Sequence, residues 1–532
     1  MALTLGYERF VRESTDANGN TVLAGVDGAQ YPLDTGKAVT VGLDGDYATL
    51  QEAFDAIVQL THFNATAFAG TVTATQGSKT VTGVGTNFPS SGSSTTLFPR
   101  YIAFDGSGKF YPIKHIVSAT EIQLVSPFAE ATVSGVVATK GDPIMHTIEI
   151  ISDITGDQQS SAALTSDGLG PNISTDNWVD VCMTIICRPG VNVGNTIAYN
   201  VRSGILVFDG FNNKDQEQHT LFYAAPDYPT AEARYFRTTD IIYRNLHIEA
   251  RNHQDVLYHQ HSPGRVYLID SYLSGHWDVY MPNASGEAYC INSTVKSLSR
   301  GGSTTEVSQA ITKLLTRTGA FFYAKNSTFW VMCASNTATN RNAWCVDLYA
   351  MVPPFTPVTG CTFIFDDCDF VGEKPPGGVE TNTTFAVFNV SVSDCDVYID
   401  GKCRYIGAPT AQASWKNLRA SYSTAANRFH FSPGTKMFPG LSSDTTYNTI
   451  KTDLALPSAI TPGASPYTYS NNVSCFTEDI VVAGGTVSAI EITRDGTTFY
   501  NVGSTAGMFT LNQGDKLKVT YSAAPTMTKI TR

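Results

Sequence analysis

The chain has 532 residues, enough for several ordinary domains or for one long repetitive body with smaller modules attached. Only 15% of the residues are charged, while Gly, Tyr and Phe number 44, 25 and 28, which excludes a charged helical protein and indicates an ordered, β-rich one. The formal net charge of -12, without a run of Lys or Arg, argues against nucleic acid as a partner and leaves neutral surfaces such as glycans open.

The N-terminal residues and the cysteines bear on where the protein is made. Glu8, Arg9 and Arg12 lie where a signal peptide would need an apolar core, and no stretch reaches about 18 consecutive apolar residues. We therefore expect synthesis in a cytoplasm, no signal peptide and no membrane insertion. The ten cysteines show no CxxC and no zinc-ligand spacing, so we expect buried, reduced thiols and neither a metal nor a cofactor.

The first helical signal lies in the stretch 44–60. Thr49 and Glu52 form a capping box, and the apolar residues after them share one helical face. That face consists of Leu50, Phe54, Ile57 and Val58. Because strand character follows almost to the C-terminus, residues 41–62 are predicted to hold a leading strand and a short helix that caps the open end of a solenoid.

Residues 63–145 are predicted to form a small inserted β module. Segments 70–77 and 79–85 alternate Thr and Val and are punctuated by glycine. Further short strands are expected at Tyr101–Phe104, Tyr111–Val117 and Glu121–Val125. The strand-like run 146–151 then continues from where the helix ended, so the module is inserted between the cap and the first coils.

A short phrase recurs between residues 146 and 435, an Asn or Asp flanked by strand residues. Its six copies centre on Asn245, Asp270, Asn292, Asn326, Asp367 and Asp394, at intervals of 25, 22, 34, 41 and 27 residues. Such a period fits one coil of a three-sided solenoid with loops at some turns, and Asn and Asp suit tight corners. The alternative is an array of β-sandwiches in which Asn-Ser-Thr is a turn-prone tripeptide.

We therefore predict an all-β fold. Its body, residues 146–456, is a right-handed single-stranded parallel β-helix with a short N-terminal capping helix, an inserted small β module and a C-terminal β module. The Pro-, Ser- and Gly-rich stretch 457–472 is predicted to be a linker, and residues 473–532 the final β module.

Three segments resemble bacteriophage tailspike and tail-fibre proteins that carry a pectate-lyase-like parallel β-helix. The stretch Asp44-Gly-Asp-Tyr-Ala-Thr-Leu-Gln-Glu-Ala53 resembles the segment that precedes the first coil of such β-helices. Segment 77–88 is similar to a small module that recurs in phage tail proteins, and segment 481–521 to modules at the ends of phage structural proteins.

This resemblance implies a location in the virion and a bacterial surface polysaccharide as the partner. It also implies a homotrimer in which three solenoids stand side by side and terminal modules mediate registration or attachment. Residues 1–40, which have turn signals at Asn18-Gly19 and Asp27-Gly28 and little core, fit an arm that docks on another virion protein.

The densest polar cluster, residues 247–278, holds five of the ten histidines. Within it, His253-Gln-Asp255-Val-Leu-Tyr258 is echoed by His276-Trp-Asp278-Val-Tyr280 at an offset of 23 residues. One coil of that length would stack the two aspartates about 4.8 Å apart, close to the roughly 5 to 5.5 Å between the two carboxylates of retaining glycosidases. The hypothesis is a glycan groove with Asp255 and Asp278 as the catalytic acid pair. Its predicted glycan contacts are His253, Tyr258, His276, Trp277 and Tyr280.

Simpler interpretations stand beside this one. In a solenoid any polar residue recurs near its copy one coil later, so the His-Asp echo also fits a solvated or hydrogen-bonded face. The carboxylates of Asp366, Asp367 and Asp369 could bind a cation, but a corner Asp with exposed neighbours explains them as well. The sequence carries no Gly-x-Ser-x-Gly, P-loop, HExxH or Rossmann glycine phrase.

Three functions therefore compete. The first is a tail spike or tail fibre that binds a host surface glycan, with hydrolase or lyase activity left open. The second is a head fibre or other structural decoration of the virion without enzymatic activity. The third, a free secreted polysaccharide-degrading enzyme, is disfavoured by the missing export signal and by the modules at both ends.

Overall fold

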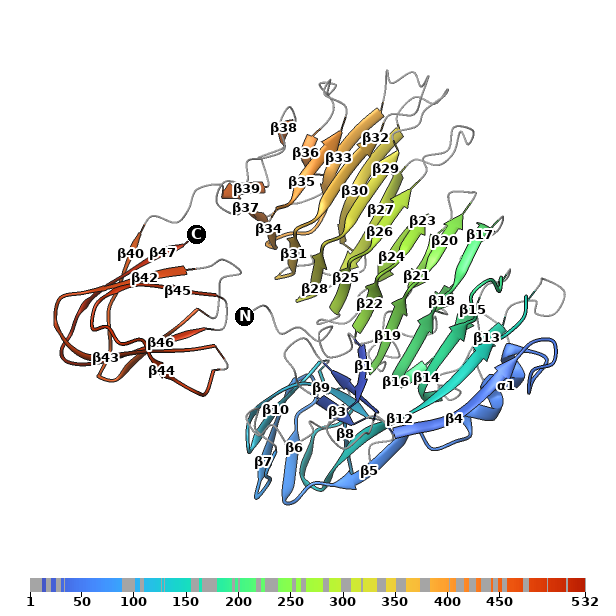
Figure 1. Ribbon diagram of the computed structural model, residues 1–532, viewed down its shortest axis with the longest axis horizontal. Helices are drawn as coiled ribbons and strands as arrows, with labels where there is room; N and C mark the ends of the chain where they lie inside the picture. Colours follow the sequence, from blue (N-terminus) through green and yellow to red (C-terminus); the bar gives the residue numbers. More distant parts are fainter. Residues whose placement is uncertain are drawn as a thin grey trace.

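The computed structural model gives the architecture of the chain, and its elements carry the labels of Figure 1. The described residues are 12–15, 21–24, 30–32, 34–88, 101–105, 110–125, 127–128, 130–154, 162–164, 179–193, 197–199, 201–216, 222–224, 238–250, 255–259, 265–280, 287–297, 308–316, 319–332, 341–350, 360–373, 383–400, 402–407, 416–420, 427–431, 442–443, 448–451, 457–471, 478–494, 496–512 and 515–531. No helix within these ranges is long and apolar enough to cross a membrane.

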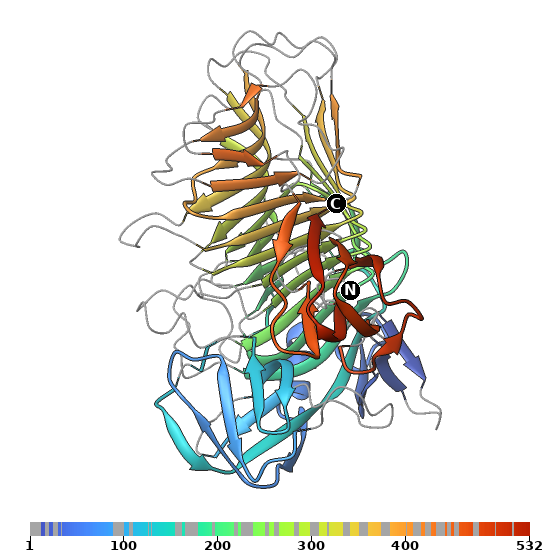
Figure 2. The same ribbon diagram turned by 90° about the vertical axis from the view of Figure 1, so that its left-hand side faces the viewer.

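The body of the protein is a parallel β-helix with three sheets, the fold class predicted from the sequence. Each full coil contributes one strand to sheet 1, then one to sheet 3, then one to sheet 2, and each strand pairs in parallel with its counterpart one coil later. Figures 1 and 2 show these coils stacked along one axis, from β4 beside α1 toward β39. The right-handed sense of the coil stays a prediction.

The strands of the three sheets have the following bounds. Sheet 1 consists of β4 (Asp34–Val41), β12 (Ala138–Ile150), β14 (Val179–Cys187), β16 (Val201–Asp209), β19 (Thr238–Arg244), β22 (Arg265–Ile269), β25 (Glu287–Ile291), β28 (Phe321–Lys325), β31 (Thr362–Asp366), β34 (Asp396–Asp400), β37 (Asn427–Phe431) and β39 (Asn448–Lys451). Sheet 2 consists of β13 (Ala162–Leu164), β15 (Ile197–Tyr199), β18 (Phe222–Ala224), β21 (Asp255–His259), β24 (His276–Tyr280), β27 (Ser308–Thr316), β30 (Arg341–Ala350), β33 (Thr383–Val390), β36 (Lys416–Ala420) and β38 (Ser442–Ser443). Sheet 3 consists of β17 (Asn212–Gln216), β20 (His247–Ala250), β23 (Tyr272–Ser274), β26 (Thr294–Ser297), β29 (Thr328–Met332), β32 (Asp369–Glu373) and β35 (Arg404–Gly407).

Asn and Asp residues form the corner between sheets 1 and 3. Five of the six predicted positions, Asn245, Asp270, Asn292, Asn326 and Asp367, lie there with φ between 48° and 55°. Their amides extend the parallel ladder around the bend, as when the Asn292 N–H donates to the Lys325 carbonyl at 2.9 Å. Asn and Asp tolerate this left-handed conformation better than other residues with a side chain.

The sixth predicted position, Asp394, does not belong to this corner. It has φ of 49° but precedes β34, so it turns the chain from sheet 2 into sheet 1. Its carbonyl accepts from the Gly360 N–H at 3.0 Å, and it therefore stacks on Gly360 and not on Asp367. The prediction failed because Asn or Asp suits any corner that needs a positive φ.

A ladder of small buried side chains lies one residue after the corner. The amides of Ser271 and Ser293 donate to the hydroxyls of Ser293 and Ser327 on the following coils, at 3.1 and 3.2 Å. Each hydroxyl donates in turn to a nearby carbonyl, as Ser293 does to Ile291 at 2.8 Å. The corner therefore keeps its buried polar groups paired while the chain bends.

The predicted helix is α1 (Leu50–Val58), and it begins with the predicted capping box. The Glu52 N–H donates to Thr49 Oγ1 at 3.2 Å, and the Thr49 N–H donates to Glu52 Oε2 at 3.1 Å. Its buried residues Leu50, Ala53, Phe54 and Ile57 join the same core as the first coils. That the helix shields the end of the solenoid stays a prediction.

Antiparallel strands occupy the inserted segment. They are β5 (Phe63–Ala67), β6 (Thr71–Ala74), β7 (Thr80–Val84), β8 (Tyr101–Phe104), β9 (Tyr111–Ser118), β10 (Glu121–Leu124) and β11 (Val133–Val136). Strand β12 joins this segment to the body, because its first half pairs antiparallel with β5 and β8 and its second half parallel with β4 and β14. The strand predicted from residue 146 therefore begins at Ala138.

The two ends of the chain also depart from their predicted boundaries. Within the predicted arm, β1 (Arg12–Thr15), β2 (Thr21–Ala24) and β3 (Gln30–Pro32) form a sheet, while β4 already belongs to the β-helix. The predicted linker 457–472 holds β40 (Ser458–Ile460) and β41 (Tyr467–Ser470), which pair with the last two strands of the chain. Alternating apolar residues there outweigh the Pro and Gly content that suggested a connector.

The C-terminal strands form two antiparallel sheets around their own core (Figure 1). The first sheet has the order β40, β47 (Thr526–Thr531), β42 (Glu478–Ala483) and β45 (Gly507–Leu511). The second has the order β41, β46 (Lys516–Ala523), β43 (Thr486–Thr493) and β44 (Tyr500–Asn501).

Buried charges connect the inserted segment to the outer face of sheet 1. Arg265 on β22 makes two bonds to Asp240 on β19, at 2.6 and 2.5 Å. Tyr101 of the inserted segment donates to Asp240 Oδ2 and to the Gly204 carbonyl, both at 3.0 Å. Three of these groups, Tyr101, Asp240 and Arg265, are at most 2% exposed, so their hydrogen bonds offset a large loss of hydration.

A second contact lies one coil further. Lys114 of the inserted segment reaches Glu287 on β25 at 2.5 Å, and Tyr289 donates to the other carboxylate oxygen at 2.8 Å. Burial raises the pKa of Glu287, and Lys114 and Arg265 outweigh that effect, so the carboxyl stays below its ordinary pKa. Burial and then Lys114 lower the pKa of Lys79 to about 8, against a smaller opposing effect of Glu287. The inserted segment is thus held by charge as well as by apolar packing.

We expect Asp240→Asn to destabilise this connection by about 3 kcal/mol, because it leaves the buried Arg265 charge without its carboxylate. Chemical unfolding and limited proteolysis of residues 63–145 measure the loss. The matched control is Glu149→Gln, which removes the exposed pair with Arg188 at 2.9 Å and should cost at most about 1 kcal/mol. Equal effects of the two variants would contradict a special role for the buried pair.

Candidate functional site

The predicted acid pair lies on neighbouring strands of sheet 2, β21 and β24. Their register places Asp255 opposite His276 and Tyr258 opposite Asp278, with an irregularity between Asp255 and Leu257. The direct stacking of Asp255 on Asp278, which an offset of 23 residues suggested, is therefore wrong. Residues that face each other on β21 and β24 are 20 or 21 positions apart, so the 23-residue offset of the echo is longer than the coil itself.

Trp277 is a second correction. Its side chain is fully buried in the inner core, where its ring centroid lies 6.3 Å from that of Phe322. It therefore cannot stack on a sugar at the surface. His253, and the side chains of Asp255, Tyr258, His276, Asp278 and Tyr280, lie outside what the structure describes, and their proposed roles stay predictions.

Polar residues continue along sheet 2 from Asp278. In register, Asp278 is followed by Lys313 on β27 and then by Asp347 on β30. Asn389 on β33 comes next and donates from Nδ2 to Asp347 Oδ1 at 2.8 Å. A row of polar residues thus runs along this sheet. Asp347 and Asn389 are each only 5% exposed, so this part of the row is hydrogen-bonded and not solvated.

The outer face of sheet 3 carries aromatic and charged side chains that sequence reasoning missed. Alternate residues of its strands, such as Ile248, Leu273 and Phe329, point into the core. The residues between them form two rows on the opposite face. One row contains His247, Tyr272, Thr294, Thr328, Asp369 and Arg404, and the other Glu249, Ser274, Lys296, Trp330, Val371 and Ile406.

At one end of this face, His247 and Tyr272 pack against each other with ring centroids 4.9 Å apart. His247 Nε2 lies 2.7 Å from Glu249 Oε1, and both side chains are more than two-fifths exposed. Burial, and then the Glu249 charge, raise the pKa of Tyr272. The Tyr272 hydroxyl is therefore a neutral donor at physiological pH, next to the His247 and Glu249 side chains.

Further along, Lys296 lies over the ring of Trp330, with Nζ 3.8 Å from the ring centroid. Trp330 is only partly exposed, and its Nε1 is buried without a hydrogen-bond partner among the described residues. Asp369 and Arg404 close this end through a bidentate pair at 2.7 and 3.0 Å. The ion pair and the cation-π contact fix these long side chains in place.

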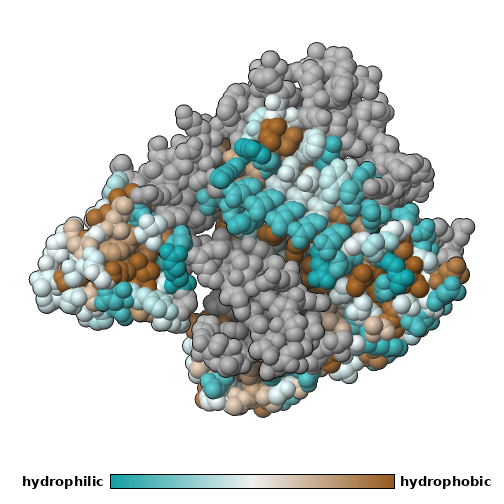
Figure 3. Space-filling view, viewed as in Figure 1, coloured by the Kyte–Doolittle hydropathy of each residue, from teal (hydrophilic) through white to brown (hydrophobic). Residues whose placement is uncertain are grey.

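The exposed corner residues, Asn245 through Asp367, border this face from β20 to β32. Asn292 Nδ2 donates to Asp270 Oδ1 at 3.0 Å, and Asn326 Nδ2 to Asn292 Oδ1 at 3.3 Å. In Figure 3 a band of hydrophilic residues crosses the surface that lies over the stacked coils. Aromatic rings beside a row of amides and carboxylates offer both apolar contact and hydrogen bonds to one ligand.

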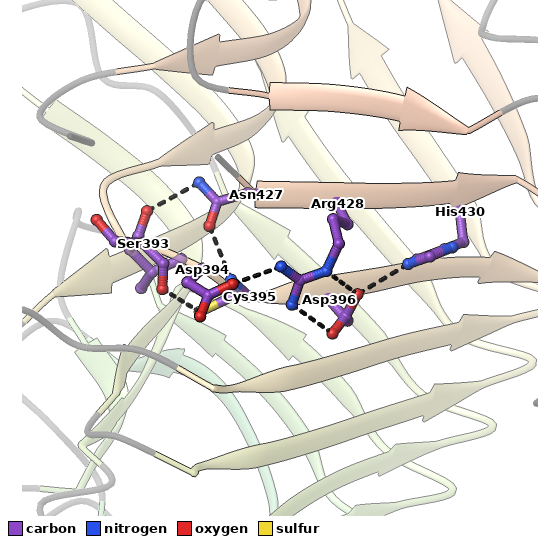
Figure 4. A network of polar contacts seen from close by, with 8 residues as sticks. Ser393, Asp394, Cys395, Asp396, Asn427, Arg428 and His430 are labelled. Atoms are coloured by element: carbon purple, nitrogen blue, oxygen red, sulfur yellow. Dashed lines mark hydrogen bonds and ion pairs between the residues drawn. The ribbon is translucent and has the colours of Figure 1, made fainter. Parts of the chain in front are cut away.

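The late coils carry a separate polar cluster on the outer face of sheet 1 (Figure 4). Arg428 on β37 binds Asp396 on β34 through two bonds at 2.7 and 2.8 Å, and it also pairs with Asp394. His430 Nε2 lies 2.8 Å from the same Asp396 carboxylate, and its ring stacks on Tyr398 at 4.4 Å. Burial raises the pKa of Asp396, and its bonds to Arg428 and His430 outweigh that effect, so the pKa falls below its ordinary value.

That cluster is internally paired, so we read it as structural. The same holds for the aspartates that could have bound a cation. Asp366 pairs with Lys325 at 3.1 Å, Asp367 accepts from the Lys402 N–H at 2.6 Å, and Asp369 pairs with Arg404. Within the described part of the chain, no three His, Cys, Asp or Glu side chains form a group that could hold a metal.

No protein-family model and no curated protein matches this sequence. Two solved structures, both tailspikes of Pseudomonas phages, are similar to it over 88% of its length. The tailspike gp49 of phage LKA1 is 9% identical with a TM-score of 0.30 over 82% of its chain, and the tailspike gp61 of phage phi297 is 10% identical with a TM-score of 0.25 over 81%. Both are of the class of protein that the sequence resembles.

Proposed function

We propose that this protein is a virion appendage that binds a polysaccharide of the host cell surface along the outer face of sheet 3. The observation that carries the proposal is the pair of rows on that face, which repeat at the coil spacing of about 4.8 Å. Tyr272 and Trp330 supply partly exposed rings. Glu249, Lys296 and the side-chain amides of the corner Asn residues supply hydrogen-bonding groups beside them. A linear polymer lying along the rows would meet a ring or a hydrogen-bonding side chain on each of these coils.

The chemistry of this face suits a neutral or weakly charged glycan. A sugar ring presents C–H groups on its faces and hydroxyls on its rim, which matches an aromatic ring flanked by amides and carboxylates. Charged side chains on sheet 3 already have polar partners there, as Glu249 has His247 and Arg404 has Asp369. A strongly charged ligand would have to displace these partners, and a neutral one would not.

Removing the aromatic contacts should weaken binding. We expect Trp330→Ala and Tyr272→Leu each to reduce affinity about tenfold, which corresponds to about 1.4 kcal/mol. Binding to purified host surface polysaccharide, measured by biolayer interferometry, tests this, and thermal melts check that each variant is folded. The control is Tyr500→Ala, a 67% exposed tyrosine of the C-terminal module, which should leave the affinity unchanged. Wild-type affinity in both sheet 3 variants would refute the proposed face.

Cleavage of the bound glycan is a separate proposal and concerns sheet 2. If Asp255 and Asp278 are the catalytic acid pair despite not facing each other directly, Asp255→Asn and Asp278→Asn should each abolish the release of reducing ends while binding persists. A lyase would instead produce ultraviolet absorbance from new double bonds. No cleavage by the wild-type protein, with binding retained, would leave adhesion alone and remove the catalytic role.

We further propose that three copies form the appendage and that a terminal region attaches it to another virion protein. Rigid elongated bodies with sheets on three sides can bury long faces against each other around a threefold axis. Sedimentation equilibrium of the full chain should give three times the mass of one chain at all micromolar concentrations tested. A monomer under these conditions would contradict the trimer and would leave the glycan proposal unaffected.

A further inference from the structure

Four of the buried cysteines lie in two stacked pairs on neighbouring coils. Cys361 precedes β31 and Cys395 precedes β34, and the strands that follow pair in register from Thr362 with Asp396. Cys368 and Cys403 follow the same two strands, and the Arg404 N–H donates to the Cys368 carbonyl at 3.0 Å. One cysteine pair therefore lies at each end of the β31 and β34 strand pair.

The two cysteines of each pair lie next to each other on neighbouring coils. The Cys368 N–H donates to Cys403 Sγ at 3.2 Å. At the other end, the N–H of Asp396, the residue after Cys395, donates to the Cys361 carbonyl at 3.0 Å. All four residues are at most 7% exposed, and the structure records them as free thiols.

The spacing of a parallel sheet suits bridges at these positions. Residues directly opposite on neighbouring strands lie about 4.8 Å apart, inside the range of about 4.4 to 6.8 Å between the Cα atoms of a disulfide. Serine occupies the equivalent corner position on the earlier coils, at Ser271, Ser293 and Ser327, where one hydroxyl per coil already satisfies the ladder. The corner therefore does not need sulfur for its hydrogen bonds.

We propose that Cys361 with Cys395, and Cys368 with Cys403, form two disulfides that fasten neighbouring coils once the protein meets an oxidising medium. Each closure breaks two S–H bonds and forms one S–S bond. The two electrons and two protons convert one molecule of a small disulfide, such as glutathione disulfide, into two thiols. The bridges span 34 and 35 positions of the chain, so they constrain the unfolded state strongly. This modification is independent of glycan binding.

The closure is expected to be slow in the folded protein. Hydrogen bonding to Cys361, and then burial, raise the pKa of Cys395, and burial raises the pKa of Cys368. The thiolate that attacks a disulfide is therefore rare at neutral pH. Transient opening of these coils, or folding in an oxidising buffer, supplies the access.

The test uses the full chain purified under reducing conditions and then exposed to glutathione disulfide at pH 8. One sample stays native, and a second is unfolded and refolded in the same buffer. Remaining thiols are alkylated in denaturant, and peptide mass spectrometry locates the bridges. We expect peptides linked through both pairs and a higher melting temperature, and reductant should reverse that increase. Cys182, whose neighbour one coil later is Ile205, should remain a free thiol and therefore be alkylated.

Two variants make the result specific. Cys395→Ser should lose the first bridge and keep the second, with part of the gain in melting temperature, whereas Cys182→Ser should keep both. If all four cysteines are alkylated in the native and the refolded sample, or carry glutathione as single adducts, the proposal is overturned. A bridge between other cysteines would overturn it as well.

Discussion

Register between successive coils is the constraint on which this structure depends. Each corner residue must bend the chain without leaving an unpaired amide, and the left-handed Asn and Asp residues between sheets 1 and 3 do so. The Asn292 N–H still donates to the next coil while its side chain bonds to Asp270 on the previous one. A shift of one residue would exchange core and surface side chains on every strand that follows. The corner ladder therefore fixes the inner core and the outer surface at once.

The outer faces of sheets 1 and 3 differ in what covers them. On sheet 1 the inserted segment covers the outer face of several coils, and the buried pair of Asp240 and Arg265 lies beneath it. Such a pair adds little net stability over apolar packing, but it penalises any displaced position of the segment, because displacement would leave a buried charge unpaired. On sheet 3 the described outer residues are mostly half-exposed, which leaves their rings and charges available to a ligand.

The sequence predicted the parts of this architecture that have local signals. Thr49 and Glu52 fix the start of α1, alternating Thr and Val fix the inserted strands, and the recurring Asn or Asp reveals the coil. It could not predict which corner Asp394 occupies, because a positive φ is needed at more than one bend of each coil. Nor could it tell that Trp277 points inward, because the phase of an alternating strand depends on its register with the neighbouring coils.

The candidate site shows the same limit more sharply. Tyr272 and Trp330 share one face because β23, β26 and β29 lie in register, although the two residues are 58 positions apart and separated by loops of different length. No sequence window contains both, so only the coil geometry could bring them together. The His-Asp echo at residues 253 to 278 drew attention because its copies are close in sequence and similar in letters. In a solenoid, side chains become neighbours through the register of their coils, and the surface must therefore be read across the strands and not along the chain.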